Sequence, residues 1–307
     1  MLTMLKDAAL NSSCMADLAA ELSNDTARDC FWGELEQLDR AYDISNATVW
    51  SFMQFRDRPS YNEDLLVDFH GWGRNIRQLK SQMGAAAKYL VLGSRHPGVF
   101  CLGGDLEAFS RYIRTRDRAA LAAYGHSCIQ ILHDNWRLSQ SGVISIGLAQ
   151  GDALGGGFES LLSFDVICAE KGTKFGFPEQ LFGLFPGMGA LTFLGRKLGF
   201  AKAEQLVRTG KLLSAEELFE MGVVHILAEP GDGVLAVEKY IRRHAPRHSA
   251  ELHMLAASKR ACPIPFEELS DIVELWADAC MTLTDHDLSV MHRLVSAQTR
   301  LEAKVAA

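Results

Sequence analysis

The sequence lacks several features that would assign it to particular classes of protein. It has no Cys-x-x-Cys pair, no low-complexity tract and no run of about 18 uncharged apolar residues, as a membrane span would need. Its seven cysteines are scattered, which favours reduced thiols over a disulfide framework or a zinc site. The net charge of −7 disfavours nucleic acid as the main partner, because phosphate binding needs a cationic surface. The first residues also lack the apolar run of a signal peptide. We therefore expect a cytoplasmic protein with no metal, no organic cofactor and no membrane segment.

Strand-like and helix-like segments alternate through the middle of the 307 residues. Short apolar runs predict strands at 47–53, 88–94, 143–148, 165–169 and 223–228. Apolar residues at helical spacing predict helices at about 62–83, 106–138, 190–199, 201–208 and 214–221. This alternation is typical of an α/β core with a largely parallel sheet.

The two ends of the chain differ from this middle part. Residues 1–45 mix short helical patterns with turn formers, and we interpret them as an N-terminal arm. Residues 46–230 form the expected core. Residues 231–307 contain no strand pattern and have long amphipathic stretches near 233–245 and 264–300. We expect this helical C-terminal region to pack over the core or over a neighbouring subunit.

Three consecutive glycines, Gly155 to Gly157, follow the strand at 143–148 and precede an apolar helix. With no side chains there, a ligand can reach the main-chain N–H groups at the helix start, which can stabilise a developing oxyanion. Tight packing of a helix on a strand also favours glycine, so the turn alone leaves both interpretations open. Its spacing is not Gly-x-Gly-x-x-Gly, which disfavours a dinucleotide site.

A second loop, Phe-Cys-Leu-Gly-Gly-Asp (100–105), also links a strand to a helix through glycines. Oxyanion holes commonly take donors from two separate segments. One N–H from residues 101–104 and one from Gly156 would meet that need. The alternative is an ordinary turn in which Asp105 caps the following helix.

Two glutamates lie close to these turns in the sequence. Glu159 follows the three glycines, and Glu179 follows Pro178 in Phe-Gly-Phe-Pro-Glu (175–179). Both have apolar neighbours, and two carboxylates near an oxyanion site can move protons in chemistry on an acyl compound. A surface glutamate stabilising a first helical turn is the ordinary alternative for each of them.

Taken together, these segments resemble the crotonase (enoyl-CoA hydratase/isomerase) superfamily over about residues 47–230. Within it the chain is most similar to the diffusible signal factor synthases, which make cis-2-unsaturated fatty acids for bacterial cell–cell signalling. The shared stretches are Leu-Gly-Gly-Asp-Leu (102–106), Glu-x-Leu-Phe-x-Leu-Phe-Pro-Gly-Met-Gly (179–189), Leu-Trp-x-Asp-x-x-Met (275–281) and Arg-Leu-Val-x-Ala-Gln (293–298). The resemblance implies a crotonase-like (ββα) superhelical core.

The resemblance also implies roles for individual residues. Glu159 and Glu179 would be the catalytic carboxylates. Gly156 would supply one oxyanion N–H and Cys101 the other, through its backbone; Gly103 and Gly104 remain alternatives because the register of that loop is open by two residues. Among the apolar residues near the catalytic turns, Phe158, Met188 and Trp276 are candidates to bind the acyl tail, although such residues are more often plain core.

For function, the resemblance implies dehydration of a 3-hydroxyacyl thioester, carried on acyl carrier protein or coenzyme A, followed by thioester hydrolysis to a free cis-2-unsaturated acid. A catabolic enoyl-CoA hydratase or isomerase with the same glutamates is the first alternative. A non-catalytic binding module is the second. Partners implied by the resemblance are the carrier, a sensor kinase, and further copies of the chain in a trimer or a dimer of trimers. Arg111, Arg114, Arg116 and Arg118 follow the first glycine loop and are candidates for carrier docking, against the simpler interpretation of a solvated helix face.

Overall fold

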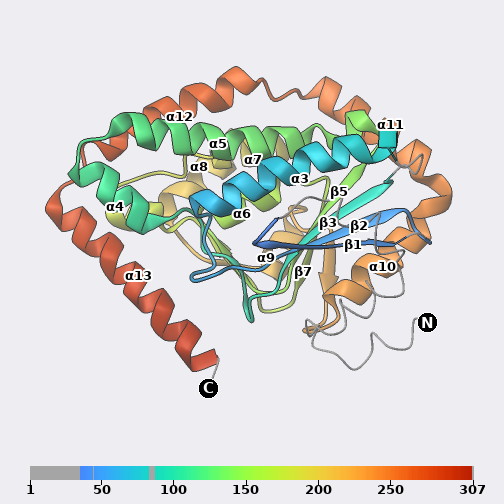
Figure 1. Cartoon of the computed structure of the whole chain (residues 1–307), viewed down its shortest axis with the longest axis horizontal. Coiled ribbons are helices and arrows are strands. Elements are labelled where there is room, and N and C mark those ends of the chain that lie inside the picture. Colours follow the sequence, from blue (N-terminus) through green and yellow to red (C-terminus); the bar gives the residue numbers. More distant parts are fainter. Residues whose placement is uncertain (1–34, 44, 83–86, 306–307) are drawn as a thin grey trace.

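The computed structural model describes residues 35–43, 45–82 and 87–305. It has two β-sheets surrounded by helices (Figure 1). The six-stranded sheet has the order β1-β2-β3-β5-β7-β10, with β1 and β2 antiparallel and the other neighbours parallel. Its strands are β1 (Leu38–Asp43), β2 (Thr48–Met53), β3 (Tyr89–Ser94), β5 (Ile144–Ala149), β7 (Val166–Glu170) and β10 (Ile226–Ala228).

The four-stranded sheet consists of short strands in the order β4-β6-β8-β9. They are β4 (Val99–Cys101), β6 (Asp152–Leu154), β8 (Lys174–Gly176) and β9 (Leu213–Ser214). Each of β3, β5 and β7 is followed in the chain by a strand of this second sheet and then by a helix. This repeated ββα unit confirms the expected crotonase-like fold, and it brings the ends of β4, β6 and β8 to the same region of the molecule.

The helices before and inside the core mostly agree with the predicted ranges. They are α3 (Glu63–Gln82), α4 (Leu106–Arg114), α5 (Arg118–Trp136), α6 (Gly156–Leu162), the 3-10 helix η3 (Pro178–Phe182), α7 (Ala190–Leu198), α8 (Phe200–Thr209) and α9 (Ala215–Glu220). The prediction of a single helix at 106–138 was wrong. Arg116 has φ +57°, and the Asp117 carboxylate caps a new helix by accepting from Ala120 N–H, so α4 and α5 are separate.

The strands β1, β4, β6, β8 and β9 were not predicted. Strand β1 lies in the range interpreted as the N-terminal arm, yet it pairs along its whole length with β2, so the sheet begins before residue 46. The other four strands have only two or three residues each, too few to show a period. Residues 1–34 of the expected arm lie outside the described residues.

The C-terminal helices pack against the core. Helix α10 (Gly233–His244) covers one face of the six-stranded sheet, where it contacts β5 and β7. On the other side α3, α5 and α12 (Phe266–Cys280) lie side by side (Figure 1). Helix α13 (Asp285–Val305) contacts α4 and η3 before it runs outward, and α11 (His248–Ala261) joins α10 to α12.

Alternate side chains of β3 show how the sheet is held between these layers. Leu90 and Leu92 point into the core cluster under α3 and α5, whereas Tyr89 and Val91 belong to the cluster under α10. Because both faces of the sheet are buried, β3 is a continuous run of apolar residues, and this run allowed the strand to be predicted from the sequence. Within the described ranges, no helix is long and apolar enough to cross a membrane.

Candidate active site

Two glycine segments meet where β4 and β6 end. The loop after β4 leads into α4, and the turn after β6 leads into α6. A Cβ atom on Gly156 would lie 3.5 Å from the nitrogen of Gly104, and one on Gly103 would lie 3.0 Å from the nitrogen of Gly156. The two backbone segments are therefore in direct contact, which the absence of side chains permits.

The N–H groups of Gly104 and Gly156 are available to a ligand. Gly156 is the first residue of α6, so its N–H has no acceptor within the helix. In the described part of the chain, no carbonyl or side chain accepts from the Gly104 N–H. Both glycines line the same cavity.

Cys101 and Gly103 lie elsewhere than the oxyanion role would require. Cys101 is fully buried in β4, and neither residue lines the cavity. The Gly103 N–H is directed at the Cys101 sulfur, 3.4 Å away. Burial raises the pKa of the Cys101 thiol to about 12, so the thiol stays protonated. Of the candidates left open in this loop, Gly104 is the one that lines the cavity, and its N–H has no acceptor among the described residues.

Glu159 is held in the first turn of α6 and is only 1% exposed. Its Oε1 accepts hydrogen bonds from the backbone N–H groups of Met188 (2.8 Å) and Ala190 (2.9 Å). These donors belong to the segment that leads from η3 into α7. They fix the orientation of the carboxylate and leave Oε2 free of these two bonds.

Glu179 reaches the same place from η3, which Pro178 helps to start. Among the described residues its Oε2 is buried without a hydrogen-bond partner. A Cβ on Gly155 would lie 2.4 Å from Glu179 Oε1, so the first of the three glycines makes room for this carboxylate. Gly155 also has φ +51°, a conformation that favours glycine.

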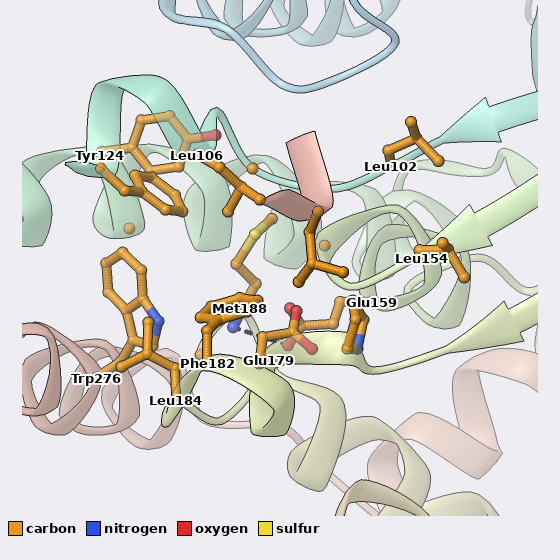
Figure 2. Close-up of a pocket in the computed structure, with 17 residues that line it drawn as sticks. Leu102, Leu106, Tyr124, Leu154, Glu159, Glu179, Phe182, Leu184, Met188 and Trp276 are labelled. Atoms are coloured by element: carbon orange, nitrogen blue, oxygen red, sulfur yellow. Dashed lines mark hydrogen bonds between the residues drawn. The ribbon is translucent and has the colours of Figure 1, made fainter. Parts of the chain in front are cut away.

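The two carboxyl groups are neighbours in the cavity (Figure 2). Burial is the largest cause that raises the pKa of each, to about 7 for Glu159 and about 8 for Glu179. The charge of Glu159 raises the pKa of Glu179 further, whereas the backbone hydrogen bonds to Glu159 oppose its own shift. Burial of both groups and the charge of Glu159 thus favour retention of a proton by the pair toward neutral pH, and the two carboxyl groups titrate together.

The cavity is mainly apolar and has a volume of about 210 Å³. Besides the carboxylates and glycines, its wall includes Leu102, Leu106, Phe109, Tyr124, Leu154, Phe182, Leu184, Met188, Trp276 and Leu294. Met188 and Trp276, two of the candidates for binding an acyl tail, both line this cavity, and their tail-binding role stays a prediction. Trp276 comes from α12 and packs against Phe109 of α4, with ring centroids 5.2 Å apart.

Phe158 is not part of this wall. Its side chain is 1% exposed and stacks against Phe177, with ring centroids 5.0 Å apart, while Phe175 lies 5.2 Å away. Helix α6 directs successive residues to different sides, so Glu159 faces the cavity while Phe158 faces the core. Leu106, Phe109, Tyr124 and Leu294 were missed, because nothing in their local sequence separates them from core residues.

The arginines near the first glycine loop are partly engaged within the protein. Arg116 donates to the carbonyl of Met281 at 2.5 Å. Arg118 forms ion pairs with Glu274 and Asp278 of α12 at 2.7 and 2.6 Å. These contacts tie the start of α5 to the C-terminal region, which leaves less of the arginine cluster for a carrier.

Comparison with known proteins identifies the family of the chain. The profile of the enoyl-CoA hydratase/isomerase family matches residues 78–258. The chain therefore belongs to this family, and its resemblance to the crotonase superfamily is confirmed.

Individual relatives are distant. A probable mitochondrial enoyl-CoA hydratase 2 of Arabidopsis thaliana is 31% identical over 181 residues, covering 57% of this chain and 56% of that protein. A short-chain-enoyl-CoA hydratase of Clostridioides difficile is 35% identical over 120 residues, covering 37% of this chain and 77% of that protein. The chain thus spans about half the length of the Arabidopsis protein.

Solved structures share the fold at low identity. An enoyl-CoA hydratase from Bacillus halodurans has a TM-score of 0.69 at 19% identity and covers 84% of this chain and 100% of its own. DspI of Pseudomonas aeruginosa has a TM-score of 0.64 at 20% identity and covers 75% of this chain and 82% of its own.

Proposed function

We propose that this protein interconverts 3-hydroxyacyl and enoyl thioesters by removing or adding water. The observation that supports this most is the pair Glu159 and Glu179, with raised pKa values, facing one apolar cavity beside the N–H groups of Gly104 and Gly156. Such a cavity strengthens electrostatic interactions because water is largely excluded from it.

The proposed chemistry uses each of these groups. The thioester carbonyl oxygen accepts from the Gly104 and Gly156 N–H groups, which stabilises negative charge on that oxygen and acidifies the proton on C2. One carboxylate removes that proton while the other carboxyl group protonates the departing 3-hydroxyl. The C2–H and C3–O bonds break, the C2=C3 bond forms, and water leaves; hydration is the reverse.

The acyl tail lies along the apolar wall toward Trp276 and Leu184. In Figure 2 these two side chains lie to one side of the two carboxylates, and the cavity they line is mainly apolar. Coenzyme A and acyl carrier protein present the same thioester group to the site, so either carrier is compatible with this proposal.

The test uses Glu159→Gln and Glu179→Gln with a panel of 3-hydroxyacyl and trans-2-enoyl thioesters. We expect each substitution to lower kcat by about 10²- to 10⁴-fold, the usual contribution of a general acid or base. Retained turnover in both variants would refute the proposal. Tyr89→Phe, which removes a hydroxyl on strand β3 from a residue that does not line the cavity, serves as the control with unchanged turnover.

A second candidate adds thioester hydrolysis, giving a free cis-2-unsaturated signal acid. Two C-terminal stretches that resemble the signal synthases both reach the cavity, through Trp276 and Leu294. In this reaction a glutamate takes a proton from water while the water oxygen attacks the same carbonyl held by Gly104 and Gly156; the C–S bond then breaks, and the carrier leaves as a thiol that takes up that proton.

Mass spectrometry of acids released from 3-hydroxyacyl thioesters separates the two candidates. Free cis-2-enoic acid supports the signal synthase, whereas enoyl thioester alone supports the hydratase. Binding of a sensor kinase and assembly into trimers stay predictions, which co-purification and analytical ultracentrifugation test.

A further inference from the structure

Residues 59–61 form a backbone clamp on the first glycine loop. The Leu102 N–H donates to the Pro59 carbonyl at 2.7 Å, and the Tyr61 N–H donates to the Gly103 carbonyl at 2.8 Å. Tyr61 and Gly104 also form an isolated parallel β-bridge. The backbone at Tyr61 therefore holds the loop that presents the Gly104 N–H.

The side chain of Tyr61 reaches the other glycine segment. Its Oη lies 2.5 Å from Ser160 Oγ, in helix α6, immediately after Glu159. Ser160 Oγ itself donates to the Gly157 carbonyl at 2.9 Å. Either hydroxyl can donate in the Tyr61–Ser160 bond. Tyr61 is 3% exposed, so water does not compete for this hydrogen bond.

Tyr124 completes the connection from α5. Its Oη donates to the Tyr61 carbonyl and accepts from the Asp105 N–H at 3.4 Å. Asp105 directly follows Gly104 and caps α4. Tyr124 also lines the cavity, so its hydroxyl links the cavity wall to Tyr61 on one side and to Asp105, next to Gly104, on the other.

We propose that Tyr61 is a positioning residue that sets the spacing between the Gly104 and Gly156 N–H donors. Its main chain holds one donor segment and its hydroxyl holds the other, through Ser160 of α6. This inference rests on the proposed function, because it assumes that both donors bind the thioester oxygen. Oxyanion donors act only when they are preorganised at the position of the developing charge.

The test variant is Tyr61→Phe, which removes the hydroxyl and keeps the ring that packs on Phe69, 6.0 Å between centroids. The matched control is Tyr89→Phe, since Tyr89 Oη is likewise buried but has no hydrogen-bond partner among the described residues. Losing a complete oxyanion donor costs about 10²- to 10³-fold in kcat, and misplacing one costs less. We expect Tyr61→Phe to lower kcat roughly 10- to 100-fold with KM changed less than about threefold.

Ser160→Ala removes the same bond from the other side, together with the Ser160–Gly157 bond, and keeps the test valid if Tyr61→Phe does not fold. In the double variant we expect kcat to be no lower than in the more affected single variant, because both changes break one connection. Independent, multiplying effects on kcat would overturn the proposal. So would a Tyr61→Phe enzyme with lower thermal stability and unchanged kcat, since that is the result of a purely structural role.

The outcome is distinguishable from failure of the proposed function. If Glu159→Gln retains full turnover, the proposed function is wrong whatever Tyr61 does. If Glu159→Gln is inactive while Tyr61→Phe turns over at the wild-type rate, only the positioning role of Tyr61 is refuted.

Discussion

Replacing Glu159 with glutamine should stabilise the protein at high pH while it removes activity. Burial raises the pKa of Glu159 from the ordinary 4.5 to about 7. Because the pKa of Glu159 is raised in the folded state, its ionisation opposes folding. The stability associated with protonated Glu159 is fully present below the unfolded pKa and is lost as pH rises through the folded pKa. Since one pKa unit corresponds to about 1.4 kcal/mol, about 3 kcal/mol of unfolding free energy is lost by pH 9.

Glutamine cannot ionise, so the variant avoids this loss. Its side-chain oxygen still accepts from the Met188 and Ala190 N–H groups, which preserves the local hydrogen bonds. We expect Glu159→Gln and wild type to have similar unfolding free energies near pH 4.5. At about pH 9 the variant should be more stable by up to about 3 kcal/mol.

Urea unfolding at the two pH values measures this difference directly. Glu268→Gln is the control, because the pKa of Glu268 is shifted in the opposite direction from that of Glu159. Hydrogen bonds from Arg196 are the largest cause that lowers the pKa of Glu268, so its stabilising contribution is present above the unfolded pKa. Its variant should therefore be less stable than wild type at both pH values, by a difference that changes little between them. The reasoning is refuted if Glu159→Gln shows no gain between pH 4.5 and 9, because Glu159 would then ionise in the fold without cost.

Three further predictions follow from the same geometry. The raised pKa values of the glutamate pair, about 7 and about 8, predict a bell-shaped pH profile of kcat/KM with its maximum between them. A flat profile from pH 6 to 9 would contradict catalysis by one protonated and one ionised glutamate. Gly155→Ala should cost about 1–3 kcal/mol in urea unfolding and lower kcat, because the residue has φ +51° and its Cβ would lie 2.4 Å from Glu179 Oε1; an active variant of wild-type stability would contradict this. Gly125→Val should separate α5 from α12 and cost about 1–3 kcal/mol in urea unfolding, since even a Cβ there lies 2.6 Å from a Val273 methyl group. Gly142→Ala, at φ +88° in open space, isolates the strain of a positive φ and is the comparison for Gly155→Ala.

Most of the core could be predicted from local sequence, for an identifiable reason. Strands buried on both faces, such as β3 and β5, are continuous apolar runs bounded by turns. In amphipathic helices such as α3, apolar residues recur every three to four positions. The strands of the second sheet left no such signal, because each is two or three residues long and depends on partners far away in the chain. Strand β1 was missed because it is only half-buried and its pairing with β2 determines it.

For the site, too, some features could be predicted from the sequence and others only from the tertiary structure. The sequence by itself determined which groups are present: two glutamates, each after a glycine- or proline-bearing turn, and glycines that expose N–H groups. Only the tertiary structure decided that Gly104 faces the cavity while Cys101 and Gly103 do not, and that Phe158 lies in the core. The physical reason is that exposure to a shared cavity, and the pKa that burial imposes on a carboxyl group, depend on atoms contributed by distant segments. The local sequence thus gives the chemical groups, and tertiary packing determines the surroundings of each group.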